Sequence, residues 1–311
     1  MANAPAGNPS SVPPESSKHV SPTHVQPMPD QAVRPAMRKA SVDRSVVQIT
    51  PTGRRVRKDR VAGEEPLEIR VVGPGAEPST VAITMRTPGH DFALAVGFLL
   101  TEGVLQGKED VKSVEYCTKG VGVEQLYNIV TVRLNRPVAD GVSRRAMLTS
   151  ASCGICGTST LDDIESRLPP ARSVKDVNID AQVLISLPDR LRSGQTIFDR
   201  TGGLHGVGLF DTDGNALFVR EDIGRHNAVD KVIGESILAQ SVLTSSTVLV
   251  VSGRVSFEIV QKAAMAGISI VAAVSAPSSL AIDAAERFGI SLAGFVRDAG
   301  ANIYSHAHRV I

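Results

Sequence analysis

The chain contains no tryptophan, and aromatic residues make up only 4% of its 311 residues. A core without many large rings must consist mainly of Val, Ile, Leu and Ala. Only three cysteines are present, an odd number that excludes the dense disulfide framework of a small secreted domain. No apolar run reaches the roughly 18 residues that a membrane-spanning helix needs. Composition therefore predicts a globular protein with an aliphatic core and no membrane partner.

The formal net charge is +1, which argues against a nucleic acid as partner. The N-terminus is rich in Pro, Ser and Asn and lacks the apolar segment of a secretory signal. Arg54-Arg55 resembles the start of a twin-arginine signal, but the charged residues 56–60 follow where an apolar stretch is required. We therefore expect the protein to be cytoplasmic.

The first part of the chain has the composition of an unfolded segment. Residues 1–44 hold 8 of the 18 prolines, and such a segment cannot bury enough apolar surface to offset its ordering entropy. We predict a disordered tail over 1–44 and a basic linker over 45–66. Between Arg34 and Arg60 there are nine Lys or Arg and two Asp. This charge run predicts a solvated arm, with a docking strip for an acidic partner as the alternative.

Order is expected from Leu67 onward, in three parts. Residues 67–150 predict a smaller N-terminal α+β subdomain, in which Thr87-Pro88 begins a helix. Residues 151–200 hold a cysteine loop and a connecting helical segment. Residues 201–311 predict an α/β part that binds a cofactor, because apolar strands alternate with helices there. The fold class is therefore α/β with a largely parallel sheet; its expected strands span 206–210, 216–219, 248–252, 269–274 and 290–296.

Polar residues gather where these strands end, which is where open α/β sheets bind their ligands. Arginine side chains and helix N-termini favour phosphate groups, so we predict a large anionic ligand, such as a nucleotide or a dinucleotide-like cofactor. The alternative is that these residues only cap helices and form surface ion pairs. No Gly-x-Gly-x-x-Gly or Walker motif is present. The candidate ligand-binding residues in these loops are Gly203, His205, Arg225, His226, Ser252 and Arg254.

Two of the three cysteines lie close together, as Cys153-Gly154-Ile155-Cys156. Two thiols at this spacing suit reversible disulfide formation, half of a zinc site, or sulfur relay through a persulfide. A thiol–disulfide oxidoreductase would place the pair at a helix N-terminus after a strand, and Gly157–Thr160 does not continue cleanly into a helix. A zinc site would need further ligands from histidines or from a second copy of the chain.

Several motifs occur in a fixed order, and together they resemble the family of formate dehydrogenase accessory sulfurtransferases, the FdhD sulfur carriers. The resemblance runs from about Val46 to Ile311. Its most specific part is the run from Asp222 to Lys231. The motifs are Cys153-Gly154-Ile155-Cys156-Gly157, Thr201-Gly202-Gly203-Leu204-His205, Asp222-Ile223-Gly224-Arg225-His226-Asn227-Ala228-Val229-Asp230-Lys231, Ser252-Gly253-Arg254-Val255-Ser256-Phe257-Glu258 and Asn302-Ile303-Tyr304.

The resemblance implies a function in cofactor maturation. Such proteins accept sulfur from a cysteine desulfurase as a cysteine persulfide. They pass it to molybdenum bis(molybdopterin guanine dinucleotide) before this cofactor enters the formate dehydrogenase apoenzyme. The resemblance also implies a cytidine-deaminase-like layered fold without the catalytic zinc, and this chain lacks the ligand motif of the zinc deaminases. We expect no structural metal, and comparable sulfur carriers favour a homodimer.

Site residues also follow from the resemblance. Cys153 corresponds to the persulfide carrier and Cys156 to its partner, which gives the protein sulfurtransferase activity. A C-terminal segment corresponds to the cofactor-binding segment of the family and consists of Phe295, Val296, Arg297, Asp298, Ala299 and Gly300. Its acidic and small residues offer fewer cationic contacts than a more basic version would. A non-catalytic module that only presents the cofactor remains an alternative, as does the oxidoreductase.

Overall fold

The computed structural model describes Met1 and residues 39–117, 127–138, 177–239 and 247–311. Both cysteines of the Cys-x-x-Cys pair, Cys153 and Cys156, lie outside the described residues. Residues 37–311 form one compact unit. The predicted α+β and α/β parts therefore belong to a single body.

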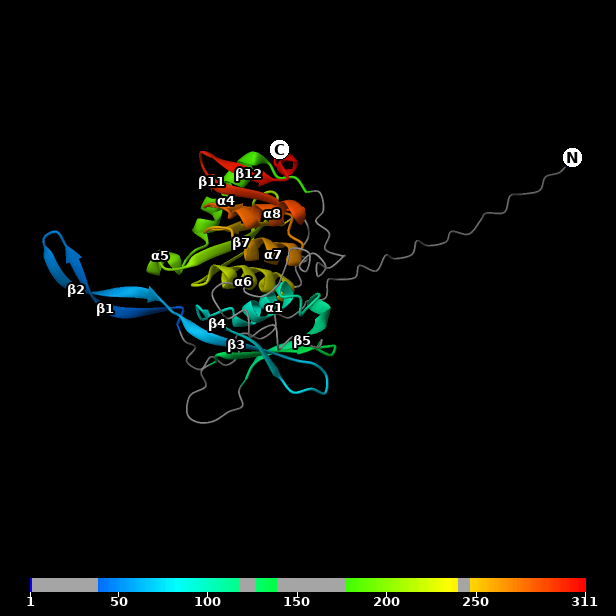
Figure 1. The fold of residues 1–311 in the computed structure, drawn as a ribbon, viewed down its shortest axis with the longest axis horizontal. Helices are drawn as coiled ribbons and strands as arrows, with labels where there is room; N and C mark the ends of the chain where they lie inside the picture. The colour runs from blue at the N-terminus through cyan, green and yellow to red at the C-terminus, as the bar shows by residue number, and fades with distance from the viewer. Residues whose placement is uncertain (2–38, 118–126, 139–176, 240–246) are drawn as a thin grey trace. The chain divides into compact units, whose positions relative to one another are not determined.

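The predicted basic linker is wrong, because residues 41–62 form a β-hairpin, drawn in blue in Figure 1. Strands β1 (Ser41–Thr50) and β2 (Gly53–Ala62) pair in antiparallel register, with Val47 opposite Val56. The turn needs a residue with positive φ, and Gly53 supplies it at 142°. The strands carry many charged residues and few apolar ones, which is why charge alone predicted a linker.

A four-stranded sheet follows, in the order β4-β3-β6-β5. Strand β3 is antiparallel to β4 and parallel to β6, and β5 is antiparallel to β6. Helix α1 begins at Asp91 after His90, not at Thr87-Pro88 as predicted, because the side chain and backbone of Thr87 bind β8 and its following loop instead. The bounds are β3 (Glu65–Val72), β4 (Ser79–Arg86), α1 (Asp91–Thr101), η1 (Lys108–Asp110), β5 (Val111–Tyr116) and β6 (Ile129–Leu134).

The second sheet has six strands in the order β12-β11-β10-β9-β7-β8. Strands β9, β10 and β11 are parallel, whereas β7 is antiparallel to β8 and β9, and β12 is antiparallel to β11. The prediction of a largely parallel sheet is therefore wrong outside its centre, because hairpins form both flanks. The strands are β7 (His205–Asp211), β8 (Ala216–Asp222), β9 (Thr247–Val251), β10 (Ile270–Ala273), β11 (Ser291–Arg297) and β12 (Gly300–Ser305).

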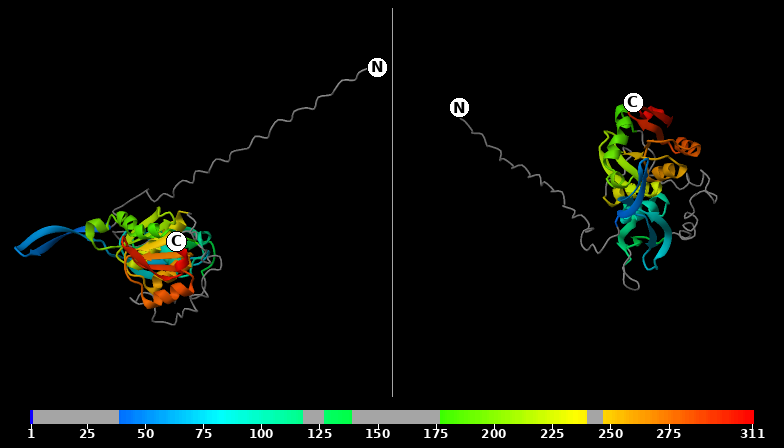
Figure 2. Two further views of the ribbon diagram at one scale, coloured as in Figure 1. Left: turned by 90° about the horizontal axis from the view of Figure 1, so that it is seen from above. Right: turned by 90° about the vertical axis from the view of Figure 1, so that its left-hand side faces the viewer.

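Helices cover both faces of this sheet (Figures 1 and 2). Helix α6 contacts β7 and β8 on one face, while α4 contacts β7, β9 and β11. Asp180 caps α4 by accepting hydrogen bonds from the backbone of Gln182 at 2.7 Å and Val183 at 3.2 Å. The helices are α4 (Ala181–Ser193), α5 (Phe198–Thr201), α6 (Arg225–Leu238), α7 (Phe257–Ala266), α8 (Ser279–Arg287) and η3 (Ala307–Arg309).

Helices α1 and α6 pack directly against each other and join the two sheets. Gly97 and Gly234 permit this close approach, since a Cβ on either would collide with the backbone of the other helix. The larger apolar cluster contains side chains from both sheets, and a smaller one lies between α4 and the six-stranded sheet. In the described part of the chain, no helix is both long and apolar enough to span a membrane.

Candidate functional site

The loops predicted to bind a ligand meet at one edge of the six-stranded sheet. His205 begins β7 and pairs with Asp222 at the end of β8. Ser252 follows β9, and its backbone N–H donates to the carbonyl of Gly206 at 2.9 Å. Because β7 is antiparallel to β9, its first residue lies where β9 ends. The predicted residues of these loops therefore share one edge, as expected for an α/β sheet.

A cavity of about 620 Å³ opens at this edge, within the size range of small-molecule sites. Gly203, His205 and Ser252 line it, and so do Gly202, Leu204 and Gly253 from the same loops. The sequence analysis missed its other wall, which comes mainly from the end of α4 and from α5. The missed lining residues are Pro188, Asp189, Leu191, Arg192, Gln195, Phe198 and Val274. The buried leucines at positions 184, 187 and 191 carry a helical period that could have revealed α4.

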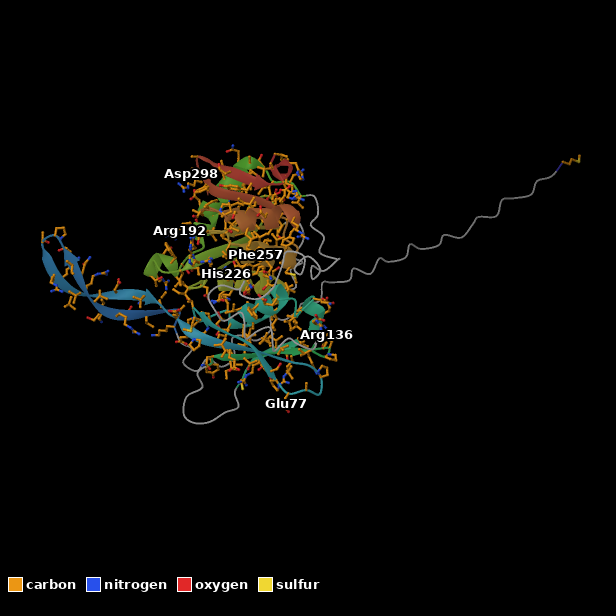
Figure 3. The ribbon with its side chains drawn as sticks, viewed as in Figure 1. Glu77, Arg136, Arg192, His226, Phe257 and Asp298 are labelled. Carbon is orange, nitrogen blue, oxygen red and sulfur yellow. The ribbon has the colours of Figure 1, made fainter. Side chains whose placement is uncertain are left out.

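The aromatic wall of the cavity is held in place by charged neighbours. The carboxylate of Glu221 accepts hydrogen bonds from the backbone N–H groups of Ile197 at 2.8 Å and Phe198 at 2.7 Å. The guanidinium of Arg192, labelled in Figure 3, lies 4.9 Å from the centre of the Phe198 ring and pairs with Asp199. A flat, apolar surface with an adjacent cation is thereby fixed before any ligand binds.

Three polar side chains lie at this edge, and we call them the polar edge: His205, Arg225 and His226. The Nε2 of His226 lies 3.1 Å from the hydroxyl of Ser256 and 3.8 Å from the carboxylate of Glu258. Burial, together with the positive charges of Arg225 and Lys262, lowers the pKa of His226 to about 4. The ring is therefore neutral at pH 7 and can accept a hydrogen bond or a proton.

His205 is electrostatically similar to His226. Burial and the charge of Arg225 lower its pKa, against the opposing charge of Asp222. Gly253 leaves room for the ring, since a Cβ there would lie 3.3 Å from Nδ1 of His205. The edge thus presents two imidazoles kept neutral beside a guanidinium, so its positive charge is concentrated on Arg225.

Arg225 has an unsatisfied donor. Its Nε is buried and has no hydrogen-bond acceptor among the described residues. It is the first residue of α6, whose N-cap, Gly224, provides no side-chain acceptor for the helix. A buried donor without a partner is costly, and a helix N-terminus attracts anions through its free N–H groups and dipole. Together these features fit an anionic group such as a phosphate.

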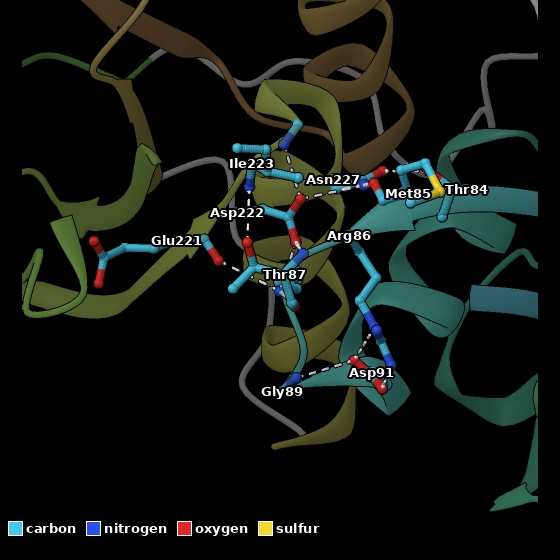
Figure 4. A network of polar contacts seen from close by, with 12 residues as sticks. Thr84, Met85, Arg86, Thr87, Gly89, Asp91, Glu221, Asp222, Ile223 and Asn227 are labelled. Atoms are coloured by element: carbon cyan, nitrogen blue, oxygen red, sulfur yellow. Dashed lines mark hydrogen bonds and ion pairs between the residues drawn. The ribbon is translucent and has the colours of Figure 1, made fainter. Parts of the chain in front are cut away.

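The same run contributes to a second set of residues with a different role, the buried network of Thr87, Asp222, Asn227 and Lys231. Figure 4 labels the first three of them. Lys231 Nζ lies 2.7 Å from the carboxylate of Asp222, and these side chains are 1% and 0% exposed. Asp222 also accepts from the backbone of Thr87 at 3.1 Å, and Asn227 donates to the carbonyl of Met85 at 2.7 Å. The network fastens the loop after β4 to the start of α6 and leaves no face for a ligand.

The remaining predicted residues are spread along the edge. Arg254 is exposed after β9. In the segment 295–300, Phe295 has a positive φ of 53°, and its N–H donates to Ser275 at 3.2 Å. The side chain of Val296 is fully buried in the smaller apolar cluster, so it can meet a ligand only through its backbone. Arg297, Asp298 and Ala299 are exposed, and Asp298 is labelled in Figure 3.

The geometry of the cysteine pair is not described, since Cys153 and Cys156 lie outside the described residues. Among the residues that are described, no three His, Cys, Asp or Glu side chains gather as a metal site. What the described edge can do is bind an anion beside a flat apolar wall, with neutral imidazoles next to it.

Comparison with known proteins gives consistent results. The model of the FdhD/NarQ family matches residues 62–311. The sulfur carrier protein FdhD of Nocardia farcinica is 50% identical over 279 residues, covering 88% of this chain and 95% of the relative. That of Streptomyces avermitilis is 46% identical over 280 residues, covering 88% and 97%. The FdhD protein of Thermoplasma volcanium is 45% identical over 258 residues, covering 82% and 90%.

The fold has a solved counterpart. The crystal structure of a protein described as a formate dehydrogenase accessory protein, from Desulfotalea psychrophila, superimposes with a TM-score of 0.65. The two chains are 22% identical, and the match covers 88% of this chain and all of the other. The resemblance carried by the motifs, the family match and these high identities agree, and they identify the chain as a member of the FdhD/NarQ family.

Proposed function

We propose that this protein is a sulfur carrier that serves formate dehydrogenase. It takes sulfur from a cysteine desulfurase as a persulfide on Cys153 and transfers it to molybdenum bis(molybdopterin guanine dinucleotide), which it binds as a substrate. Relatives that share about half of its residues are named sulfur carrier proteins, and the sequence contains the Cys-x-x-Cys pair. The proposal includes a cytoplasmic location, a homodimeric state and the relation of the fold to the cytidine deaminases.

The observation that carries the cofactor part of this proposal is the unpartnered Nε of Arg225. The charge of Arg225 acts on His205, which lines the cavity. A guanine dinucleotide is multiply anionic, so its diphosphate would supply the acceptor that Arg225 lacks and would lie against the N-terminus of α6. A guanine base is flat, and the Phe198 ring with the neighbouring Arg192 offers a surface on which it can stack. The donor set thus fits the proposed ligand.

The sulfur step follows ordinary thiol–disulfide exchange. The Cys153 thiolate attacks the outer sulfur of the desulfurase persulfide, a new S–S bond forms, and the desulfurase cysteine leaves as a thiolate. Attack of the Cys156 thiolate on Cys153 then forms a disulfide and releases the outer sulfur as hydrosulfide toward the bound substrate.

The described residues have supporting roles in this scheme. Arg225 holds the diphosphate, and His205 and His226 stay neutral because burial and Arg225 lower the pKa of each. A neutral imidazole adds no positive charge that would bind the phosphates too tightly for release.

Mass spectrometry after incubation with a cysteine desulfurase and free cysteine tests the proposal. The wild-type protein should gain one sulfur on the peptide that contains Cys153 and Cys156, and a reductant should remove it. Cys153→Ala should lose this sulfur and fail to restore formate dehydrogenase activity. Cys117→Ala is the matched control and should keep both. Absence of added sulfur on demonstrably free thiols would contradict the proposal and favour a module that only presents the cofactor.

A further inference from the structure

The β1–β2 hairpin exposes apolar side chains that no described residue covers. Val47, Ile49 and Val56 are 57%, 73% and 72% exposed. Val47 lies opposite Val56, and Ile49 is two residues from Val47. Because side chains in a strand alternate between its two faces, all three lie on the same face. They form an apolar patch, which we call the hairpin patch.

The charge of the hairpin is opposite to that of the chain that follows it. Residues 39–62 contain seven Lys or Arg and two Asp, whereas residues 63–311 contain 23 Lys or Arg and 28 Asp or Glu. Both aspartates are already paired, Asp43 with Arg60 at 3.0 Å and Asp59 with Arg57 at 2.9 Å. Arg54, Arg55 and Lys58 therefore remain without a carboxylate partner among the described residues. Arg54 and Lys58 lie on the same face as the hairpin patch, and Arg55 lies on the other face.

A sheet of this size is not stable by itself. Two antiparallel strands with exposed apolar side chains are marginal in water and need a surface to pack on. Both strands also have an outer edge whose backbone groups pair with no other described strand, and such edges bind extended partner segments. An apolar centre surrounded by arginines is typical of a protein interface, where arginine is enriched.

The observations favour a protein over a nucleic acid as the partner. Residues 39–62 contain no aromatic side chain on which a base could stack. The excess of acidic residues in the rest of the chain would repel a polyanion that extends beyond the hairpin. The surface that complements the hairpin is one with acidic residues around an apolar centre.

The base of the hairpin lies beside the cavity. Strand β2 contacts α5, and a Cβ on Gly203 would lie 3.7 Å from Cβ of Ala62. Gly203 and Phe198 line the cavity, so the base of the hairpin is close to the site proposed to hold the substrate. The hairpin also precedes the part of the chain that the family model matches, residues 62–311.

We propose that the hairpin is a docking arm for the enzyme that receives the cargo, formate dehydrogenase in its apo form, through an acidic surface with an apolar centre. This inference rests on the proposed function, which supplies the acceptor. The hairpin patch provides buried apolar contact, and Arg54, Arg55 and Lys58 accelerate association and set its dependence on salt.

The test measures binding of purified apo-formate dehydrogenase to the full chain by biolayer interferometry. The variant Val47→Ser/Ile49→Ser/Val56→Ser should bind at least tenfold more weakly than the wild type. The variant Arg54→Glu/Arg55→Glu/Lys58→Glu should also lose at least tenfold, mainly in the association rate. Wild-type binding should weaken as NaCl rises from about 50 to 300 mM. Leu217→Ser/Leu280→Ser, which changes exposed apolar side chains elsewhere, is the control and should bind as the wild type does.

Four parallel readouts separate this inference from the proposed function: persulfide loading, GDP binding, light scattering and DNA binding. Persulfide loading of Cys153 by the desulfurase and binding of GDP should be unchanged in both hairpin variants. Failure of the wild type to load sulfur would contradict the proposed function, whereas unchanged affinity of both variants for the apoenzyme would overturn the docking arm. Three other outcomes would assign the hairpin to a different partner and would also overturn the docking arm. The variants could lose loading by the desulfurase, or light scattering could show that they lose a dimer. The wild type could also bind duplex DNA that the variants do not bind.

Discussion

The polar edge and the buried network each take most of their residues from the same run of sequence, Asp222–Lys231, yet these residues differ in almost every physical property. Asp222 and Lys231 are 0% and 1% exposed and are paired at 2.7 Å. Arg225 and His226 are only partly buried, and Arg225 Nε has no acceptor among the described residues. The buried network has satisfied its polar groups, whereas the polar edge has not. A long specific motif therefore contains fold-determining residues as well as residues available to a ligand.

The largest effect is expected from breaking the buried network. Lys231→Met would leave the Asp222 carboxylate buried without its cation, which costs about 3–5 kcal/mol in the free energy of unfolding. Urea denaturation followed by circular dichroism measures this change. Lys112→Met, at an exposed position, is the control and should change stability by less than about 0.5 kcal/mol. A loss below about 1 kcal/mol for Lys231→Met would show that the network does not hold the fold.

A smaller effect, on binding and not on stability, is expected at the polar edge. Arg225→Met removes a charge-assisted hydrogen bond to the ligand, worth about 1.5–3 kcal/mol, so the Kd for GDP should rise about 10- to 100-fold. Isothermal titration calorimetry measures it. Arg133→Met, on the four-stranded sheet, should leave the Kd unchanged. Equal affinities of Arg225→Met and the wild type would remove Arg225 from the site.

The smallest effect concerns protonation. The charge of Arg225 contributes to the lowered pKa of His226, about 4, so Arg225→Met should raise this pKa toward the ordinary value of about 6.5. In the wild type, between about pH 4 and 6.5, His226 binds a proton more readily in the unfolded chain than in the folded chain. The free energy of unfolding should therefore fall as the pH falls from about 6.5 to 4. NMR titration of the ring protons checks the shift, and an unchanged pKa in Arg225→Met would refute the coupling.

The sequence predicted those features that depend on local pattern. The apolar run 248–252 predicted a strand buried on both faces, and β9 is fully buried over Thr247–Val251. Arg225 was expected between a strand and a helix, and it is the first residue of α6 after β8; its contact with a ligand stays a prediction. The α5 wall with Phe198 was missed, since its place at the cavity depends on the carboxylate of Glu221, 23 residues away in sequence. Val296 was placed in the site by resemblance, but packing puts its side chain in the core.

The hairpin was missed for a different reason. Its strands satisfy the period of two, but the residues that alternate are mostly charged, and charge density predicted a linker. Hydrophobic patterning detects strands that cover a core, and β1 and β2 cover none. The same property that concealed the hairpin from pattern analysis suits it to contact with a partner.

The most direct test of the difference between the polar edge and the buried network is a crystal structure of the protein with bound GDP. The account predicts the diphosphate at the N-terminus of α6, with an oxygen within hydrogen-bond distance of Arg225 Nε, and the guanine against the Phe198 ring. The Asp222–Lys231 pair should be unchanged. A diphosphate bound elsewhere, with Arg225 Nε still lacking an acceptor, would contradict the account.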